Sequence, residues 1–228
     1  MKLKVLYTFL LINISFISWS QDTINQFDEN GKRHGVWKKY FENSKQLRYQ
    51  GTFHHGKEVG VFKFYCSDCK DQPMVIKQFS DKTDSTFVQF FAKKGKLASQ
   101  GYMIGKKRVG EWLYFQKRGK QIMSKEFYKD GKLEGKKTTY YKNNVVAEEV
   151  TYKNGLKEGV SKIYSFTGVL LKELPYQNDQ LHGKVIYYDG KGAIEIEGNY
   201  KNGLKDGVWK YYKNGTLIKE EVFPKPRK

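Results

Sequence analysis

The two cysteines, Cys66 and Cys69, lie in the segment Cys66-Ser67-Asp68-Cys69. In an oxidising compartment a pair this close most simply forms a local disulfide. Free thiols are the second interpretation, and metal or redox chemistry is the third. A thioredoxin-like role needs a strand-to-helix junction, and no helical period surrounds the pair. A zinc site would need two further ligands at a recognised spacing. We therefore expect a loop disulfide and no bound metal.

Histidines and glutamates are the other residues suited to acid–base chemistry. His34 and His182 occupy the same position of an internal repeat, directly before a glycine, which is typical of surface turns. Carboxylates from neighbouring repeats could reach the separation used by glycoside hydrolases. Charged residues opposite lysines on a solvated strand face explain the same pattern. The recurring glutamates are Glu149, Glu173, Glu197 and Glu220. Because no nucleophile, phosphate or nucleotide motif is present either, we expect no catalytic residues, no cofactor and no enzyme.

A repeat carries these residues and fills almost the whole chain. A glycine is followed five residues later by an aromatic residue, and this phrase returns every 24 or 25 residues. The pairs are Gly35 and Tyr40, Gly60 and Tyr65, Gly110 and Phe115, Gly135 and Tyr140, Gly159 and Tyr164, Gly183 and Tyr188, and Gly207 and Tyr212, with Ser85 and Phe90 in the third place. A fixed period of this size predicts a repeat array.

Each repeat is predicted to contain two β-strands. In the last clear copy, residues 208–212 are β-branched and aromatic, Asn214-Gly215 is a strong hairpin signal, and 217–222 form the returning strand. No window shows a helical period, so we expect an all-β chain of stacked hairpins that are not stable alone. The segment 66–86 carries an insert and lacks the glycine at Ser85. We expect a longer loop or a distorted corner there.

A second series lies two residues after each glycine position. It runs Trp37, Phe62, Phe87, Trp112, Lys137, Ser161, Val185 and Trp209. One interpretation is that these side chains are packed, and it is favoured because large aromatic residues are mostly buried. The other is an interaction face that displays rings to a partner. The members of that face would be Trp37, Phe62, Phe87, Trp112 and Trp209.

The segments 31–41 and 202–215 resemble the MORN repeat variant, in the form common in bacterial exported proteins. The resemblance covers about residues 28–223. It implies an elongated, twisted antiparallel sheet of about eight stacked β-hairpin repeats. It also implies a role in protein association, scaffolding or membrane-surface attachment, without catalysis. Some bacterial members of the family are labelled YwqK-type antitoxins. The chain departs from the pattern at Ser85, in the cysteine insert, and at Lys137, Ser161 and Val185.

The ends of the chain differ from the array. Lys2 and Lys4 precede an apolar stretch over 5–17, and small residues end at Ser20. This pattern predicts a signal peptide over 1–20, cleaved near Ser20-Gln21. Thirteen apolar residues fall short of the ~20 needed to span a bilayer, and no later stretch in the mature chain is long enough. We expect a short segment over 21–27, the array over 28–223, a basic tail over 224–228, and export to the periplasm or the extracellular space.

The net charge is strongly positive, +18 for the full chain. It comes from 37 Lys and 5 Arg, whereas bidentate recognition of phosphate favours Arg. The lysines are spread through every repeat, which is typical of a solvated face that keeps a long sheet soluble. We therefore expect no nucleic-acid partner. A weak attraction to anionic surfaces remains.

Three functions are consistent with these features. The leading hypothesis is a non-catalytic exported scaffold that binds an unidentified protein or envelope component. The second is an antitoxin or immunity role, in which the chain neutralises a toxin by complex formation. The third is electrostatic binding to acidic polysaccharide or to an anionic membrane surface.

Overall fold

A computed structural model describes residues 23–69, 71–117 and 119–224. The expected signal peptide and residues 225–228 of the basic tail lie outside these ranges. The described residues form twenty β-strands and no helix, which confirms the all-β prediction. Accordingly, within these ranges we find no helix that could cross a membrane.

The N-terminal half of the array contains β1 (Gln26–Phe27), β2 (Arg33–Tyr40), β3 (Leu47–His54), β4 (Lys57–Phe64), β5 (Val75–Phe79), β6 (Ser85–Phe91), β7 (Leu97–Ile104), β8 (Lys107–Phe115) and β9 (Ile122–Lys129). The C-terminal half contains β10 (Lys132–Leu133), β11 (Gly135–Tyr140), β12 (Val146–Lys153), β13 (Leu156–Lys157), β14 (Gly159–Tyr164), β15 (Leu170–Gln177), β16 (Gln180–Leu181), β17 (Gly183–Tyr188), β18 (Ile194–Lys201), β19 (Leu204–Lys213) and β20 (Thr216–Phe223).

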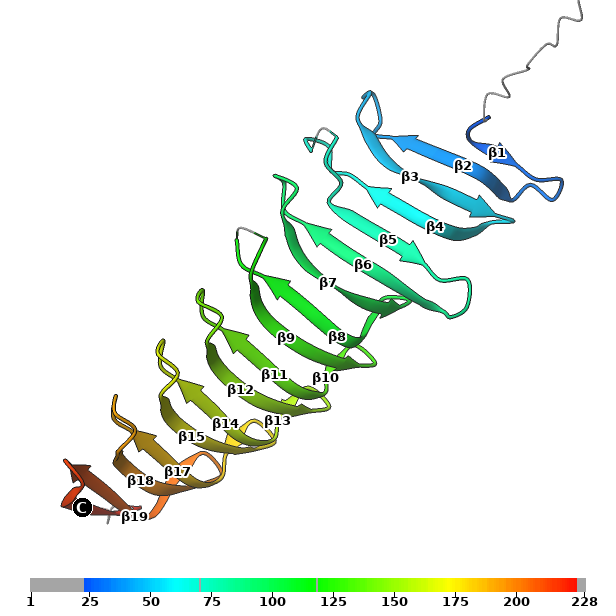
Figure 1. The fold of residues 1–228 in the computed structure, drawn as a ribbon. Coiled ribbons are helices and arrows are strands. Elements are labelled where there is room, and N and C mark those ends of the chain that lie inside the picture. The colour runs from blue at the N-terminus through cyan, green and yellow to red at the C-terminus, as the bar shows by residue number, and fades with distance from the viewer. Residues whose placement is uncertain (1–22, 70, 118, 225–228) are drawn as a thin grey trace, which may run out of the picture.

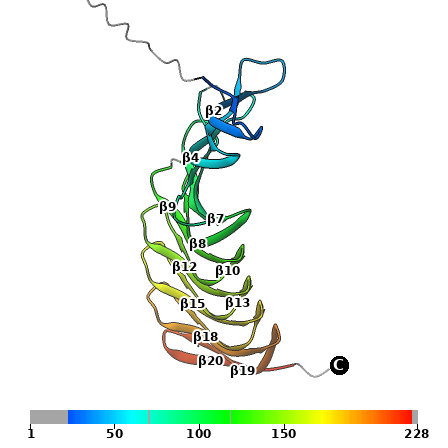
Figure 2. The same ribbon diagram turned by 90° about the vertical axis from the view of Figure 1, so that its right-hand side faces the viewer.

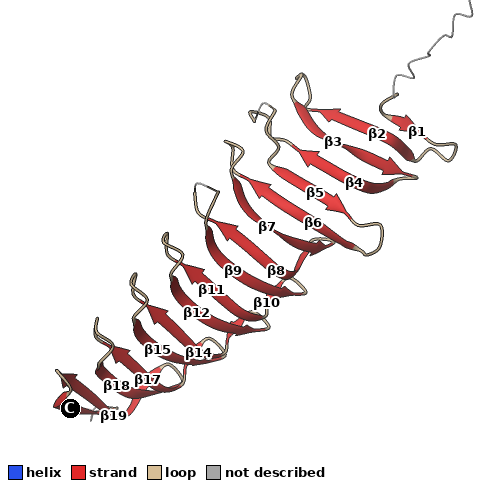
Figure 3. Cartoon of the chain, viewed as in Figure 1, coloured by secondary structure: helices blue, strands red, loops and turns tan. Residues whose placement is uncertain are grey.

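The strands form one open antiparallel sheet in which pairing follows chain order. The short strands β10, β13 and β16 extend the turns between repeats by pairing with β9, β12 and β15. Figure 1 shows the hairpins stacked along one long axis, from β1 at one end to β19 at the other. Figure 2 shows that the strands bend, and Figure 3 shows turns along both long edges.

The repeated glycines and aromatic residues occupy two irregular points of each hairpin. All seven repeat glycines have positive φ, between 65° and 108°, a conformation that costs glycine little because it has no Cβ. In six repeats the register shifts directly before the recurrent aromatic residue, so this ring sits at a β-bulge. The turns between repeats, such as Asn154-Gly155, place both residues at positive φ, as type I′ turns require.

The irregular segment has a specific structural consequence at Ser85. The long loop expected here lies between Phe64 and Val75, and a second loop separates β5 from β6. The β5–β6 pair runs without a register shift, unlike the repeats that carry the bulge glycine. Alternation along β6 is therefore displaced by one residue, and Val88 occupies the buried position in place of Phe87.

Most of the buried apolar side chains among the described residues lie in one row along one face of the sheet, which we call the central column. Cross-strand pairing and side-chain contacts connect most of its members from β2 to β20. The registers of β12 with β14 and of β15 with β17 place the remaining members in the same row. The members of the central column are Trp37, Gly51, Phe62, Lys77, Val88, Gly101, Trp112, Glu126, Lys137, Val150, Ser161, Leu174, Val185, Gly198, Trp209 and Glu221. We call the face that carries the central column the inner face, and the opposite face the outer face.

Burial of side chains in the central column contradicts most of the interaction face proposed from the sequence. Phe62 and Trp112 are 0% exposed and Trp209 is 2% exposed, so these three rings are not available to a partner. Trp37, in the first hairpin, is half-buried. Phe87 lies on the outer face because of the displaced register. The packed interpretation therefore holds for the centre and the C-terminal end of the series.

Candidate functional site

Basic side chains cover the tryptophans of the central column. The guanidinium carbon of Arg108 lies 4.7 Å from the Trp112 ring centre, and the ammonium nitrogen of Lys205 lies 3.9 Å from the Trp209 ring centre. Arg33 covers Trp37 at 5.1 Å. These three basic residues all stand two positions before the repeat glycine. Cation–π contact together with the aliphatic stems keeps water off a one-layer core.

Along the central column, side chains from neighbouring repeats are matched in size. A Cβ added to Gly101 would lie 2.6 Å from atoms of the Trp112 ring, and one added to Gly198 would lie 2.3 Å from the Trp209 ring. The glycines therefore make room for the rings of the next repeat. Where Lys137 replaces the aromatic residue, Glu126 replaces the glycine. The Lys137 ammonium lies 2.9 Å from the Glu126 carboxylate, so the substituted repeat is matched by charge.

Both oxygens of the Glu126 carboxylate are hydrogen-bonded within the fold. It accepts hydrogen bonds from the Tyr128 hydroxyl at 2.6 Å and from the Ser124 hydroxyl at 3.3 Å. Burial alone would raise the pKa of Glu126, but the bonds from Tyr128 and Lys137 outweigh it and hold the pKa below its usual value. This carboxylate is an ionised structural group and not a proton donor.

The recurring glutamates occupy the outer face and are also paired. Glu197 lies 2.8 Å from the Lys184 ammonium and accepts a 2.7 Å hydrogen bond from the Tyr212 hydroxyl of the next repeat. The bond from Lys184 is the main reason that the pKa of Glu197 is lowered. Glu149 and Glu173 have the same kinds of partner. A glycoside hydrolase acid needs a raised pKa, and Glu197 shows the reverse.

The outer face carries a row of exposed apolar side chains, which we call the outer stripe. Five of its members lie one position after a repeat glycine or opposite that position on the paired strand, and Tyr102 lies opposite Phe87. Each is between 41% and 64% exposed. The members are Val61, Tyr102, Phe127, Val160, Val208 and Val222. Sequence reasoning missed this row because it followed the position two residues after the glycine, which points to the inner face.

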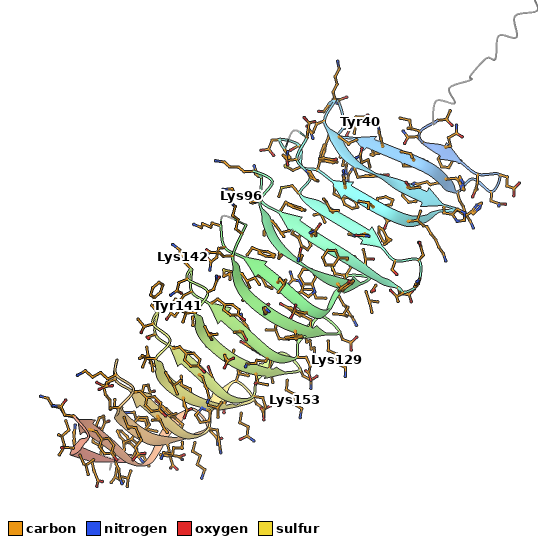
Figure 4. All side chains as sticks on the ribbon, in the orientation of Figure 1. Tyr40, Lys96, Lys129, Tyr141, Lys142 and Lys153 are labelled. Carbon is orange, nitrogen blue, oxygen red and sulfur yellow. A yellow bond between two sulfur atoms is a disulfide. The ribbon has the colours of Figure 1, made fainter. Side chains whose placement is uncertain are left out.

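A mainly apolar hollow lies at one edge of the sheet, and we call it the edge notch. It has a volume of about 830 Å³ and is lined by Leu97, Ala98, Phe115 and Met123. Its basic rim consists of Lys96, Lys117 and Lys142. Figure 4 shows Lys96 and Lys142 at one edge of the sheet, and Lys129 and Lys153 at the other. Lysines at the turns therefore flank the sheet on both sides.

The remaining residues singled out in the sequence lie near the N-terminal end. Cys66 and Cys69 are joined by a disulfide, so neither sulfur is free to bind a metal. Asp68, between them, pairs with the Lys93 ammonium at 2.7 Å. The prediction of a surface turn position is wrong for His34, which lies in β2, is half-buried and contacts His55 with 4.9 Å between the ring centres.

The fold and its surfaces define a non-globular β-hairpin repeat protein. Residues 133–154, 157–178 and 181–202 match the MORN repeat variant, so these three hairpins are MORN repeats of the variant form. The same hairpin geometry continues on both sides of the matched region. MORN repeats are a non-enzymatic repeat type generally associated with protein and membrane binding. No curated protein matches the chain.

Proposed function

We propose that the mature chain is an exported, non-catalytic scaffold that binds a partner protein through the outer face of β7 to β9. The observation that carries the proposal is the clustering of exposed apolar side chains there. Tyr102 is 49% exposed, and Phe127 and Met123 are each 41% exposed. Phe127 and Met123 stand on the same face of β9, on either side of Lys125. Exposed apolar groups rimmed by polar residues are typical of interaction sites.

A partner that binds this region needs a surface of complementary chemistry. The edge notch accepts apolar side chains, and its three lysines favour Asp and Glu around them. Neutralisation of a toxin would use the same surface, and the identity of the bound partner distinguishes that role from scaffolding. Electrostatic attachment to an anionic surface is the second candidate, supported by the lysines along both edges. It predicts that binding falls steeply with salt and is insensitive to loss of the apolar groups.

Site-specific crosslinking tests the proposal. A photoreactive benzoylphenylalanine in place of Phe127 should crosslink one defined protein in the producing cells. The same group in place of Leu204, which is 74% exposed near the C-terminal end, should not. Combined Phe127→Ser and Met123→Ser changes should abolish retention of that protein, while Leu204→Ser should retain it. Equal crosslinking from both positions, or retention by the double variant, would contradict the proposal.

A further inference from the structure

Three of the four histidines gather at the N-terminal end of the array. His34 is on β2, His54 ends β3, and His55 begins the turn to β4. The pairing of β2 with β3 brings His34 and His54 together, with 5.4 Å between ring centres. A hydrogen bond of 2.8 Å from the Gly56 amide to the Arg33 carbonyl ties the turn to β2. These contacts hold the three imidazoles in one cluster.

Asp28 completes the cluster from the loop after β1. Its side chain is only 7% exposed although it carries a charge. One carboxylate oxygen, Oδ1, accepts hydrogen bonds of 2.9 Å from the amides of Asn30 and Lys32. The other oxygen, Oδ2, lies 2.7 Å from Nδ1 of His55. The carboxylate is therefore fixed in position, with one oxygen directed at the histidines.

His34 contains a buried polar atom that the protein leaves unsatisfied. Its Nδ1 atom is enclosed and has no hydrogen-bond partner among the described residues. An unpaired buried nitrogen costs free energy, and coordination to a bound ion is one way to satisfy such an atom. Donor atoms of Asp28, His34 and His55 all lie within 4.8 Å of one another.

We propose that Asp28, His34 and His55 bind a divalent transition metal ion, with zinc as the best match. Two imidazoles and one carboxylate are a donor set that zinc accepts. Zinc–ligand distances of about 2.0–2.2 Å place neighbouring donors of a tetrahedral site about 3.3 Å apart. The His55 side chain is 53% exposed and can close this gap by rotation. Binding displaces the proton between Asp28 and His55, and the fourth position is left to water or to a donor from a partner.

The site would close the first hairpin of the array. Its three ligands come from the β1–β2 loop, β2 and the β3–β4 turn, so one ion joins all three segments. Terminal repeats have a neighbour on one side only and gain most from such a link. Metal binding should therefore raise the thermal midpoint of the chain.

His182 provides a matched control within the same molecule. It occupies the position of His34 in a later repeat, but its Nδ1 atom lies 3.3 Å from the Asn202 side-chain amide oxygen. A neutral amide in place of the histidine and carboxylate gives no comparable donor set. Comparing His34 with His182 therefore distinguishes a complete set of metal ligands from a histidine that only precedes a repeat glycine.

Calorimetric titration of the tag-free chain with zinc chloride tests the proposal. One ion per chain is expected, with affinity lowered at least about 10-fold by His34→Ala or Asp28→Asn and unchanged in His182→Ala. Circular dichroism must show that each variant remains folded. Cobalt substitution gives an independent readout, because a tetrahedral site produces visible absorption that His34→Ala should remove. Absence of saturable binding, or equal affinity in the His34→Ala and His182→Ala variants, would overturn the site.

Discussion

Glu126 and Lys137 form an ion pair at 2.9 Å in a row that places a glycine beneath an aromatic ring at Gly51, Gly101 and Gly198. The two residues are in adjacent hairpins, eleven positions apart, as are Gly101 and Trp112. The Gly101–Trp112 pair is thus matched by size and the Glu126–Lys137 pair by charge. The exception to the aromatic pattern at Lys137 is compensated in the preceding repeat.

The pairwise match predicts that the two kinds of pair are interchangeable. Lys137→Trp alone should destabilise the fold, because the ring would meet the Glu126 carboxylate. Lys137→Met should cost about 2 kcal/mol, since it leaves a mostly buried carboxylate without its ammonium partner. Lys137→Trp combined with Glu126→Gly should restore stability to near that of the parent chain. A double-mutant cycle by urea denaturation measures the coupling, and additive effects would contradict the match.

The size match at Gly101 predicts a sharp cost for a single methyl group. Gly101→Ala would place a Cβ 2.6 Å from the Trp112 ring, whose position is fixed by a 2.9 Å hydrogen bond from its indole N–H to the Tyr102 carbonyl. We expect a loss of about 2 kcal/mol or more. Gly190→Ala is the control, because nothing lies within 4 Å of the added atom and the residue has no positive φ. Similar melting temperatures for the two variants would disprove this packing.

The hydrogen bond between Tyr212 and Glu197 predicts a role for the recurrent aromatic residue in joining repeats. Tyr212→Phe removes a 2.7 Å bond to the preceding repeat and should cost about 1 kcal/mol. Tyr65→Phe is the matched control, since Gln50 stands there in place of the glutamate. Thermal unfolding should show the larger decrease for Tyr212→Phe. Equal decreases would indicate that the ring and not the hydroxyl joins the repeats.

The lowered pKa of Glu126 predicts a specific dependence of stability on pH. Because this carboxyl has a lower pKa in the folded chain than its ordinary value of 4.5, its stabilisation is complete above that value. The stabilisation is lost as pH falls through the folded pKa. The parent chain should exceed Glu126→Gln in stability at pH 7, and the difference should narrow on acidification. Urea midpoints at pH 7 and pH 3 measure it, and a constant difference would show that Glu126 contributes nothing by its charge.

The architecture was predictable from sequence because its signals are local and repeated. A positive-φ glycine such as Gly159 and an aromatic residue such as Tyr164 recur in step, and backbone hydrogen bonding between neighbours follows from that order. Asn154-Gly155 marked a turn for the same reason. Because every repeat has the same pattern, the strands of one repeat predict those of the next, and the prediction needs little knowledge of long-range contacts.

The faces of the sheet depended on features that the spacing alone does not contain. A side chain changes face when the register moves by one residue, and the regular pairing at Ser85 moves Phe87 outward and Val88 inward. Burial of Trp112 depends on cover from Arg108, whose position over the ring is a tertiary contact. The exposed row therefore lay one position away from the row proposed as an interaction face.

The sequence by itself determined a stack of antiparallel hairpins, because the glycine and aromatic positions constrain the backbone within each 24- or 25-residue unit. Only the tertiary structure decided which side chains meet. Asp28 and His55 are 27 residues apart, yet their donor atoms are 2.7 Å apart. That distance depends on how the first strands pair and how two turns fold back, since contacts between repeats are set by register and not by residue type.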